Sequence, residues 1–318
     1  MQENECSYSI IIPHKNTPDL LQRCLDSIPC RDDVQIIVVD DNSDADKVDF
    51  EHFPGIGDQR VDVYFTKEGK GAGYARNVGM CHAKGDWLIF ADADDYFYTD
   101  NLSQLMDMDI PEEFNVVVWK SKYVYLDGRF EWVQEEDMGS SDILCRKYDT
   151  VEKMYLKYVP PWTKMVRKKF CCDKTINFEE VRYSNDEIFS TMVGINIRSY
   201  LYVNILVYCH ERRDGSLVEK VTLDNCLCRL YVYFRKNKIL KQYGTKIDYH
   251  LAHIRVYNIS YCSFLRTFFK ELKILGWRYA LQDYLEICRL LDISYIPFFR
   301  KISVRRLKHH FSVKNSME

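Results

Sequence analysis

Short apolar runs alternate with helical patterns through the first hundred residues, and this alternation limits the choice of fold more than any other feature. The runs at residues 8–12, 34–39, 61–65 and 87–91 are strand-sized and rich in β-branched or aromatic residues. Residues 17–28 and 71–83 carry apolar or small residues at helical spacing. Strands that alternate with helices form βαβ units, so the sequence predicts an α/β fold with a mostly parallel central sheet flanked by helices.

The rest of the chain is less regular. We expect strands at residues 116–119, 123–126 and 199–208, and helices at 150–158 and 185–195. After Ser216 the pattern is mainly helical to the end of the chain, without an internal repeat. The sequence therefore predicts an α/β domain at residues 1–217 and a helical C-terminal region at 218–318.

Composition narrows the class of protein. Of the 318 residues, 47% are hydrophobic and 29% are charged, which is typical of a globular protein. The formal net charge of −3 gives no indication of a nucleic-acid partner. No apolar run is long enough to cross a membrane, and the polar N-terminus lacks the apolar core of a secretory signal. The 12 cysteines include no CxxC pair, so we expect a reduced, cytoplasmic protein without structural zinc.

Polar clusters follow three of the predicted strands at the points where these strands end. They are Pro13-His14-Lys15-Asn16, Asp40-Asp41-Asn42-Ser43 and Asp92-Ala93-Asp94-Asp95. The carboxyl ends of parallel strands share one edge of a sheet, where α/β proteins bind ligands. One acidic turn is usually only a solvated turn, but three at the same edge predict a binding site.

The acidic cluster after the fourth strand predicts a metal site. The carboxylates of Asp92, Asp94 and Asp95 repel one another, and a bound cation offsets that repulsion. Mg²⁺ or Mn²⁺ prefers a few carboxylates together with the oxygens of a substrate diphosphate. The alternative is a turn in which an aspartate caps a helix. We expect Asp92, Asp94 and Asp95 to bind Mg²⁺ or Mn²⁺.

Segments along the first two thirds of the chain occur in a specific order. They read YSIIIPHKN from residue 8, QIIVVDDNSD from 35, GAGYARNVGMCHAKGDWLIFADADDYF from 71, PPWTKMVRKKF from 160, NFEEVRYSNDEIF from 177 and HERRDGSL from 210. Together they resemble family-2 glycosyltransferases of the GT-A fold, over about residues 7–217. The resemblance implies an enzyme that moves a sugar from a nucleoside diphosphate sugar to an acceptor hydroxyl, with inversion at the anomeric carbon.

The resemblance assigns donor-binding roles at the predicted sheet edge. Asp40 and Asp41 resemble the pair that reads the base and ribose, and Arg76 resembles a donor-site arginine. The predicted nucleotide-sugar site also contains Pro13, Lys15, Asn16 and the DxD residues Asp92 and Asp94. The family often has an aromatic residue where Lys15 stands, so uracil, guanine and thymine all remain open as the base.

The resemblance also assigns the acceptor side. Trp162 and Lys164 match the family's Trp-x-Lys segment near the acceptor. Asp186 matches the position of the catalytic base, which takes the proton of the attacking hydroxyl. Asn185 replaces the usual acidic residue before it, and Glu187 is the alternative base. Neighbouring helical residues point about 100° apart, so only one of the two carboxylates should face the site.

The predicted activity is hexosyl or N-acetylhexosaminyl transfer to a lipid-linked saccharide in surface polysaccharide synthesis. Two other functions remain open, namely a non-catalytic component of a synthesis complex and a sugar nucleotidyltransferase. A dehydrogenase is disfavoured because GAGYAR follows the third strand and not the first. His210 is open between a residue near the metal or diphosphate and a surface histidine.

The C-terminal residues carry a separate prediction. Residues 264–291 have apolar side chains at helical spacing, which favours packing against the rest of the protein. Residues 296–311 combine Arg300, Lys301, Arg305, Arg306 and Lys308 with aromatic and aliphatic residues and contain no acid. A basic amphipathic helix of this kind can lie on an anionic membrane surface. We therefore expect a peripheral position on the inner face of the cytoplasmic membrane.

Overall fold

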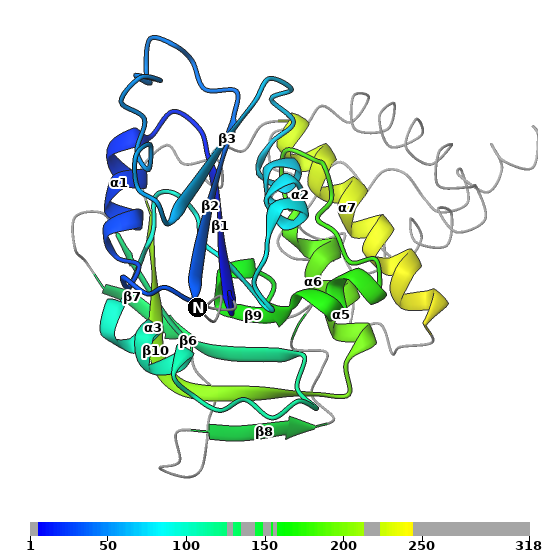
Figure 1. Ribbon diagram of the computed structural model, residues 1–318. Helices are drawn as coiled ribbons and strands as arrows, with labels where there is room; N and C mark the ends of the chain where they lie inside the picture. The colour runs from blue at the N-terminus through cyan, green and yellow to red at the C-terminus, as the bar shows by residue number, and fades with distance from the viewer. Residues whose placement is uncertain are drawn as a thin grey trace, which may run out of the picture. The chain divides into compact units, whose positions relative to one another are not determined.

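The computed structural model describes residues 6–125, 130–134, 144–148, 154, 158–212 and 223–243 (Figure 1). The chain divides into two compact units, Met1–Val232 and Tyr233–Glu318. The division predicted at 217/218 falls between described residues and stays a prediction. Several other predictions also lie outside the described residues, namely those on Ser216, residues 264–291 and the basic segment at 296–311. Of the helix predicted at 150–158, only residues 154 and 158 are described.

The first half of the sheet is parallel, as the sequence predicts. Its strands are β1 (Tyr8–His14), β2 (Val34–Asp41), β3 (Val61–Thr66) and β4 (Trp87–Phe90), in the spatial order β3-β2-β1-β4. Every residue of β1 and β2 is buried, which explains why both strands read as continuous apolar runs. Their register sets Tyr8 beside Val34 and His14 beside Asp40.

The second half of the sheet is mixed. Its strands are β5 (Tyr96–Phe97), β6 (Val116–Tyr125), β7 (Phe130–Gln134), β8 (Leu144–Tyr148), β9 (Lys164–Arg167) and β10 (Ser199–Arg212). Strand β9 lies antiparallel between β4 and β6, and β10 runs parallel to β6. The two strands expected at 116–119 and 123–126 are one strand, because Ser121 is buried and pairs with β10.

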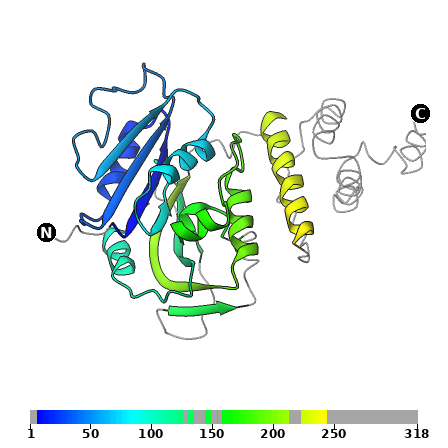
Figure 2. The ribbon, with the colours of Figure 1, turned by 45° about the vertical axis from the view of Figure 1, so that its right-hand side comes forward.

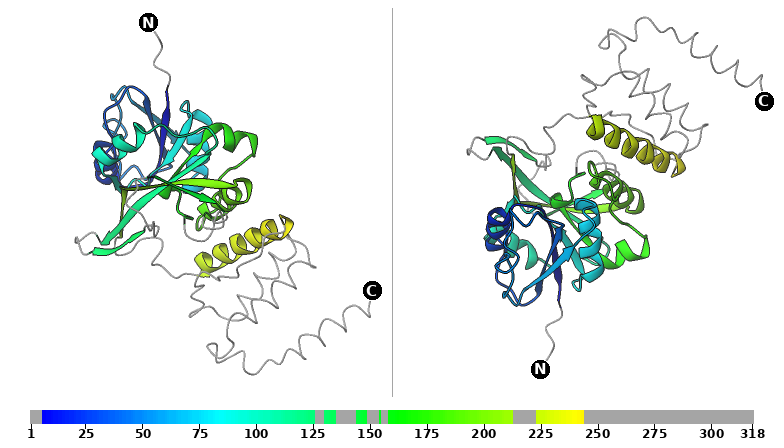
Figure 3. Two further views of the ribbon diagram at one scale, coloured as in Figure 1. Left: turned by 90° about the horizontal axis from the view of Figure 1, so that it is seen from below. Right: turned by 90° about the horizontal axis from the view of Figure 1, so that it is seen from above.

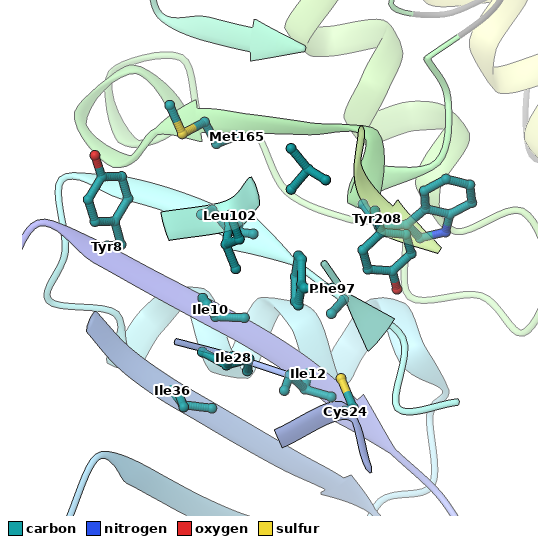
Figure 4. Close-up of a cluster of buried hydrophobic side chains, with 14 of the residues drawn as sticks. Tyr8, Ile10, Ile12, Cys24, Ile28, Ile36, Phe97, Leu102, Met165 and Tyr208 are labelled. Carbon is teal, nitrogen blue, oxygen red and sulfur yellow. The ribbon is translucent and has the colours of Figure 1, made fainter. Parts of the chain in front are cut away.

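Helices cover both faces of the sheet (Figures 1 and 2). The described helices are α1 (Pro18–Asp26), α2 (Ala72–His82), α3 (Thr99–Met106), α5 (Lys168–Asp173), α6 (Asp186–Asn196) and α7 (Leu223–Gln242), with a 3₁₀ turn at Pro161–Thr163. Side chains of α1 and α3 pack with alternate residues of β1 and β2 in one core cluster, which Figure 4 shows in part. Side chains of α2, α5 and α6 pack in a second cluster on the opposite face, and the views in Figure 3 show the same separation.

Glycine residues let α2 approach its neighbours closely. A Cβ atom at Gly79 would lie 2.4 Å from the side chain of Ile11 in β1. A Cβ atom at Gly73 would lie 2.1 Å from the carbonyl oxygen of Glu179. The second contact brings the start of α2 against the segment that leads into α6, and both segments carry predicted site residues.

Two further predictions can be compared with the described residues. Within the described part of the chain, no helix has the length and apolar character needed to cross a membrane. The cysteines whose side chains the structure describes form no disulfide, and they are Cys6, Cys24, Cys30, Cys81, Cys171, Cys172, Cys209 and Cys228. Cys24 and Cys209 lie in apolar sequence patterns and are buried, as expected for cysteines that act as small apolar residues. Cys81 also lies in an apolar pattern, but it is exposed, so the same expectation is wrong for this residue.

Candidate active site

The predicted site residues gather at one edge of the sheet, where β1, β2 and β4 end. The parallel register of these strands sets their carboxyl ends side by side. Strands β6 and β10 also run parallel to β4, since β9 is antiparallel to both β4 and β6. The carboxyl end of β10, with Tyr208, His210 and Glu211, therefore lies at the same edge.

Asp40 is fully buried and bonded within the protein. His14 Nδ1 lies 2.7 Å from Asp40 Oδ2, and the backbone N–H and hydroxyl of Ser43 also donate to the carboxylate. His14 Nε2 accepts the N–H of Thr17, so the proton of the neutral ring lies on Nδ1 and points at Asp40. Burial by itself would raise the pKa of Asp40, but the hydrogen bonds from His14 and Ser43 lower it. The carboxylate thus holds the β2 turn in shape.

Lys15 and Asn16 also shape this turn. Asn16 has a backbone φ of 60°, and its side chain exchanges hydrogen bonds with Asp44. Lys15 Nζ donates to the carbonyl oxygen of Asp41 over 2.9 Å, and nearly half of its side chain is exposed. Pro13 is buried in β1 beside Val39. Of the predicted donor residues after β1, Lys15 has the most exposed position for contact with a ligand.

Asp41 differs from Asp40 because one carboxylate oxygen is left unpaired. Asp41 Oδ2 accepts the backbone N–H of Gly71 over 2.9 Å. Asp41 Oδ1 is buried and accepts no hydrogen bond from the described residues. A buried carboxylate oxygen without a donor is costly. This atom therefore fits an N–H or O–H group that a ligand brings.

Arg76 joins two of the predicted motifs. Its guanidinium donates from Nη2 to Asp92 Oδ1 and from Nη1 to Asn185 Oδ1, the latter over 2.7 Å. The guanidinium also lies over the ring of Phe178, and the residue is 5% exposed. Arg76 is therefore a buried bridge between the acidic motif after β4 and the start of α6.

Asp95 has a different environment from Asp92 and Asp94. It is fully buried, and its carboxylate accepts hydrogen bonds from Tyr208 Oη, the His210 ring and the Glu211 N–H. Burial of the ring disfavours the charged form of His210, but the Asp95 carboxylate outweighs this effect and raises the pKa of His210 to about 9. Asp92 and Asp94 are half-buried, and the Asp94 carbonyl accepts from Arg23.

The Tyr208 hydroxyl clamps the acidic turn. It accepts the Asp92 N–H over 2.9 Å and donates to Asp95 Oδ2 over 2.8 Å. Trp162 stacks on Tyr208 and His210, with ring centroids 5.0 Å and 5.1 Å apart. The acidic turn, β10 and the Trp162 segment therefore form one packed unit.

We expect Tyr208→Phe to weaken donor binding without unfolding the protein. The ring still packs, but the hydroxyl that orders the acidic turn is lost, and a buried hydrogen bond of this kind contributes about 1–3 kcal/mol. Calorimetric titration with a nucleoside diphosphate and Mn²⁺ should show a dissociation constant raised by about fivefold or more. Tyr98→Phe, at the half-buried residue between β5 and α3, is the control. Equal affinity of Tyr208→Phe and wild type would contradict the clamp.

Asp186 is the first residue of α6, next to the asparagine that Arg76 binds. Burial of its carboxyl is the main cause that raises the pKa of Asp186 to about 6, and the neighbouring Glu187 raises it further. A carboxylate with such a pKa is suited to accept a proton near neutral pH. Glu187 is also half-buried at this end of α6, so it stays the alternative base.

The two residues predicted to lie near the sugar acceptor, Trp162 and Lys164, are both buried. Trp162 is 4% exposed, and its carbonyl accepts from Trp119. Lys164 is fully buried, and its ammonium is directed at Tyr158, Pro160 and Ser190 within the protein. Their assignment to the acceptor side stays a prediction.

Sequence reasoning did not single out His14, Tyr208 or Asn185 as parts of this network. Tyr208 lies 113 residues from Asp95 and looks like any aromatic residue of a buried strand. His14 is the last residue of β1 and is in register with Asp40 near the end of β2, and the position of both residues after buried apolar runs is the signal that the sequence offers. His210, which the sequence left open, is held in the network by Asp95.

Comparison with known proteins gives a family match and several similar proteins. The family model described as glycosyl transferase family 2 matches residues 9–172. Glycosyltransferase GlyG of Streptococcus pneumoniae is 25% identical over 267 residues, which cover 79% of this chain and 85% of GlyG. Poly(ribitol-phosphate) beta-N-acetylglucosaminyltransferase TarS of Staphylococcus aureus is 25% identical over 216 residues, and the match spans 36% of its length.

A solved structure confirms the fold. The crystal structure of S. aureus TarS residues 1–349 in complex with UDP-GlcNAc superposes with a TM-score of 0.61 at 19% identity, covering 86% of this chain and 82% of that one. The likeness agrees with the predicted GT-A architecture of a central sheet flanked by helices. The family match spans more than half of the chain. The chain therefore belongs to glycosyltransferase family 2.

Proposed function

We propose that this glycosyltransferase moves a hexosyl or N-acetylhexosaminyl group from a nucleoside diphosphate sugar to a hydroxyl of a saccharide acceptor in a cell-surface polymer. The observation that carries the proposal is the bridge from Asp92 through Arg76 to Asn185. This bridge brings the acidic motif, which suits a diphosphate and its cation, next to Asp186, which suits a base. TarS, a relative, is named for N-acetylglucosaminyl transfer to poly(ribitol phosphate).

Asp92 and Asp94 would hold a divalent cation. Both are half-buried carboxylates at the end of β4, and hard oxygen ligands of this kind suit Mg²⁺ or Mn²⁺. Among the described residues, no group of three or more His, Cys, Asp or Glu side chains is arranged to hold a metal ion. The remaining ligands would then be diphosphate oxygens and water. When bound there, the cation supplies charge that stabilises the departing diphosphate.

Asp95 supports this site from behind. Its carboxylate already accepts from Tyr208, His210 and the Glu211 N–H, so we assign it a positioning role in place of the ligand role expected from sequence. Arg76 holds Asp92 on the other side. Together these contacts fix the acidic turn before a donor binds, which lowers the reorganisation required for the reaction.

Asp186 would act as the base for the attacking hydroxyl. Attack by the acceptor from the face opposite the diphosphate gives inversion at the anomeric carbon. The proton of the hydroxyl passes to an Asp186 carboxylate oxygen as the new glycosidic bond forms and the bond to the diphosphate breaks. Proton NMR of the product, which distinguishes the two anomers, tests the inversion.

Asp41 would recognise the base of the nucleotide. Among the described residues, no group donates to its Oδ1 atom, whereas Oδ2 already accepts from Gly71, so the carboxylate fits a single N–H group. The N3–H of uracil or thymine is such a group, whereas guanine presents two neighbouring N–H groups. This geometry favours a uridine or thymidine diphosphate sugar over a guanosine one.

We expect Asp41→Asn to raise the dissociation constant for UDP by about 10- to 100-fold. The amide keeps the shape of the side chain but weakens the acceptor, and a hydrogen bond to a charged group contributes about 1.5–3 kcal/mol. Calorimetric titration with UDP, TDP and GDP measures the effect. The exposed Asp46→Asn in the same loop is the control, and unchanged UDP affinity in Asp41→Asn would rule out this contact.

The acceptor and the membrane remain parts of the proposal that rest on sequence. A lipid-linked saccharide would bring the reaction to the inner face of the cytoplasmic membrane. The basic segment 296–311 would suit that surface. The proposal as a whole is tested by release of nucleoside diphosphate from a panel of nucleotide sugars with saccharide acceptors. A non-catalytic component of a synthesis complex would release none above background.

A further inference from the structure

Lys164 is a fully buried lysine at the start of β9, one turn away from the Pro160-Pro161 sequence. Its Nζ atom donates to the carbonyl oxygen of Tyr158, to that of Pro160 over 3.1 Å and to Ser190 Oγ over 3.0 Å. None of these acceptors belongs to β9 itself. The side chain therefore connects the segment before the 3₁₀ turn with helix α6.

The hydrogen-bond pattern requires the charged form of this lysine. Ser190 Oγ donates its own proton to the carbonyl oxygen of Val159 over 2.6 Å, so it can only accept from Lys164. Three acceptors thus use the three protons of an ammonium group. Burial opposes this charge and lowers the pKa of Lys164 to about 7, although nearby Asp186 raises it. Moving a charged group from water into the protein costs free energy. Once all its protons are hydrogen-bonded, the group and its partners form a rigid network.

The two segments that Lys164 connects both carry residues of the proposed active site. Ser190 lies four residues after Asp186 in α6, and residues at this spacing share one face of a helix. On the other side, Pro160 leads directly into the turn that carries Trp162, which stacks on Tyr208 and His210. One ammonium group therefore links α6, at a residue one turn after Asp186, with the segment that leads to the packed unit around the acidic motif.

We propose that Lys164 is a positioning residue, which fixes Asp186 relative to the Trp162 segment and does not touch the acceptor. This inference rests on the proposed role of Asp186 as the base. A displacement of about 1 Å in a reacting group can cost about 100-fold in rate, so loss of the connection should appear in kcat. Ser190 is fully buried and has no access to an acceptor, which makes it an independent probe of the same connection.

The test compares Lys164→Met, Ser190→Ala and the double variant, each assayed for sugar transfer below its melting temperature. We expect Lys164→Met to lower kcat by about tenfold or more, with the KM for the donor changed less than about threefold. Ser190→Ala should lower kcat by a smaller factor, and the double variant should lose little beyond Lys164→Met, because both changes break one connection. Lys168→Met is the matched control, since Lys168 Nζ donates to the Ala83 carbonyl, away from α6.

The outcomes separate this inference from the proposed function. A lower melting temperature with wild-type kcat in both single variants would show a purely stabilising role and overturn the inference. A raised KM for the acceptor in Lys164→Met, with wild-type kinetics in Ser190→Ala, would show that Lys164 contacts the acceptor directly and would overturn the inference. If Lys164→Met does not fold, kcat of Ser190→Ala decides. Asp186→Asn in the same assay tests the base separately, because wild-type kcat there would reject the base and not the connection.

Discussion

Replacing Asp186 with asparagine should lower kcat by about 10²- to 10⁴-fold, the usual contribution of a general base. Asparagine preserves the size of the side chain at the start of α6 but cannot take the proton of the acceptor hydroxyl. The base acts mainly in the transition state, so donor affinity should stay near the wild-type value. Rapid-quench measurement of sugar transfer, with calorimetric donor titration, checks both parts.

The pH dependence of the wild type follows from the same residue. Burial raises the pKa of Asp186 to about 6, and only the ionised carboxylate can accept a proton. The rate should therefore fall about tenfold for each pH unit below this pKa. Glu187→Gln is the companion variant. If Glu187→Gln is inactive and Asp186→Asn is near wild type, the base is the neighbouring residue.

Replacing Asp94 with alanine should reduce transfer below detection while the protein stays folded. The change removes one of the two carboxylates proposed to hold the cation at the end of β4. Wild-type activity should fall to the same level in excess EDTA and return when Mn²⁺ or Mg²⁺ is added. The assay is release of nucleoside diphosphate, with circular dichroism as the check on folding.

The exposed Asp100→Ala, a few residues further along the chain in α3, is the matched control for the loss of an aspartate. It should keep wild-type activity and the same requirement for the cation. Full wild-type activity in excess EDTA would reject the metal, whatever the behaviour of Asp94→Ala. If the wild type needs no metal and Asp94→Ala is inactive, Asp94 contacts the donor nucleotide sugar directly and binds no cation.

Much of the parallel half of the sheet could be predicted because its strands are buried on both faces. The observed strands β1, β2 and β4 match the strands expected at residues 8–12, 34–39 and 87–91 to within two residues at each end. Continuous apolar runs of this length have few other solutions when helical patterns separate them. The edge that carries the site follows from the same argument, since polar residues directly after buried strands must come together there.

Strand β9 could not be predicted in the same way. It has only four residues, and it is stabilised by pairing with β4 and β6, which are far away in the sequence. The segment therefore reads as a motif near an acceptor and not as part of the sheet. Its antiparallel direction brings the start of β9, and so Trp162 and Lys164, to the edge where the parallel strands end.

The sequence also does not predict that neighbouring aspartates have different environments. Asp40 and Asp41 are adjacent and identical, but successive strand residues point to opposite faces of a sheet. Asp40 contacts His14 and Ser43, whereas one buried oxygen of Asp41 has no donor within the part of the chain that the structure describes. Asp95 lies in the turn after β4 and differs from Asp94 because its carboxylate has partners on β10. Which carboxylate is available to a ligand depends on contacts that only the tertiary structure supplies.

We propose that one edge of the sheet binds a nucleoside diphosphate sugar and that Asp186 at this edge activates the acceptor. The most direct measurement is single-turnover transfer by wild type and Asp186→Asn, with UDP- and TDP-sugars, Mn²⁺ and a saccharide acceptor. We predict transfer by the wild type, and normal donor binding with transfer slowed by about 10²- to 10⁴-fold in Asp186→Asn. Wild-type protein that binds no nucleotide sugar, or Asp186→Asn that transfers sugar at the wild-type rate, would contradict the account.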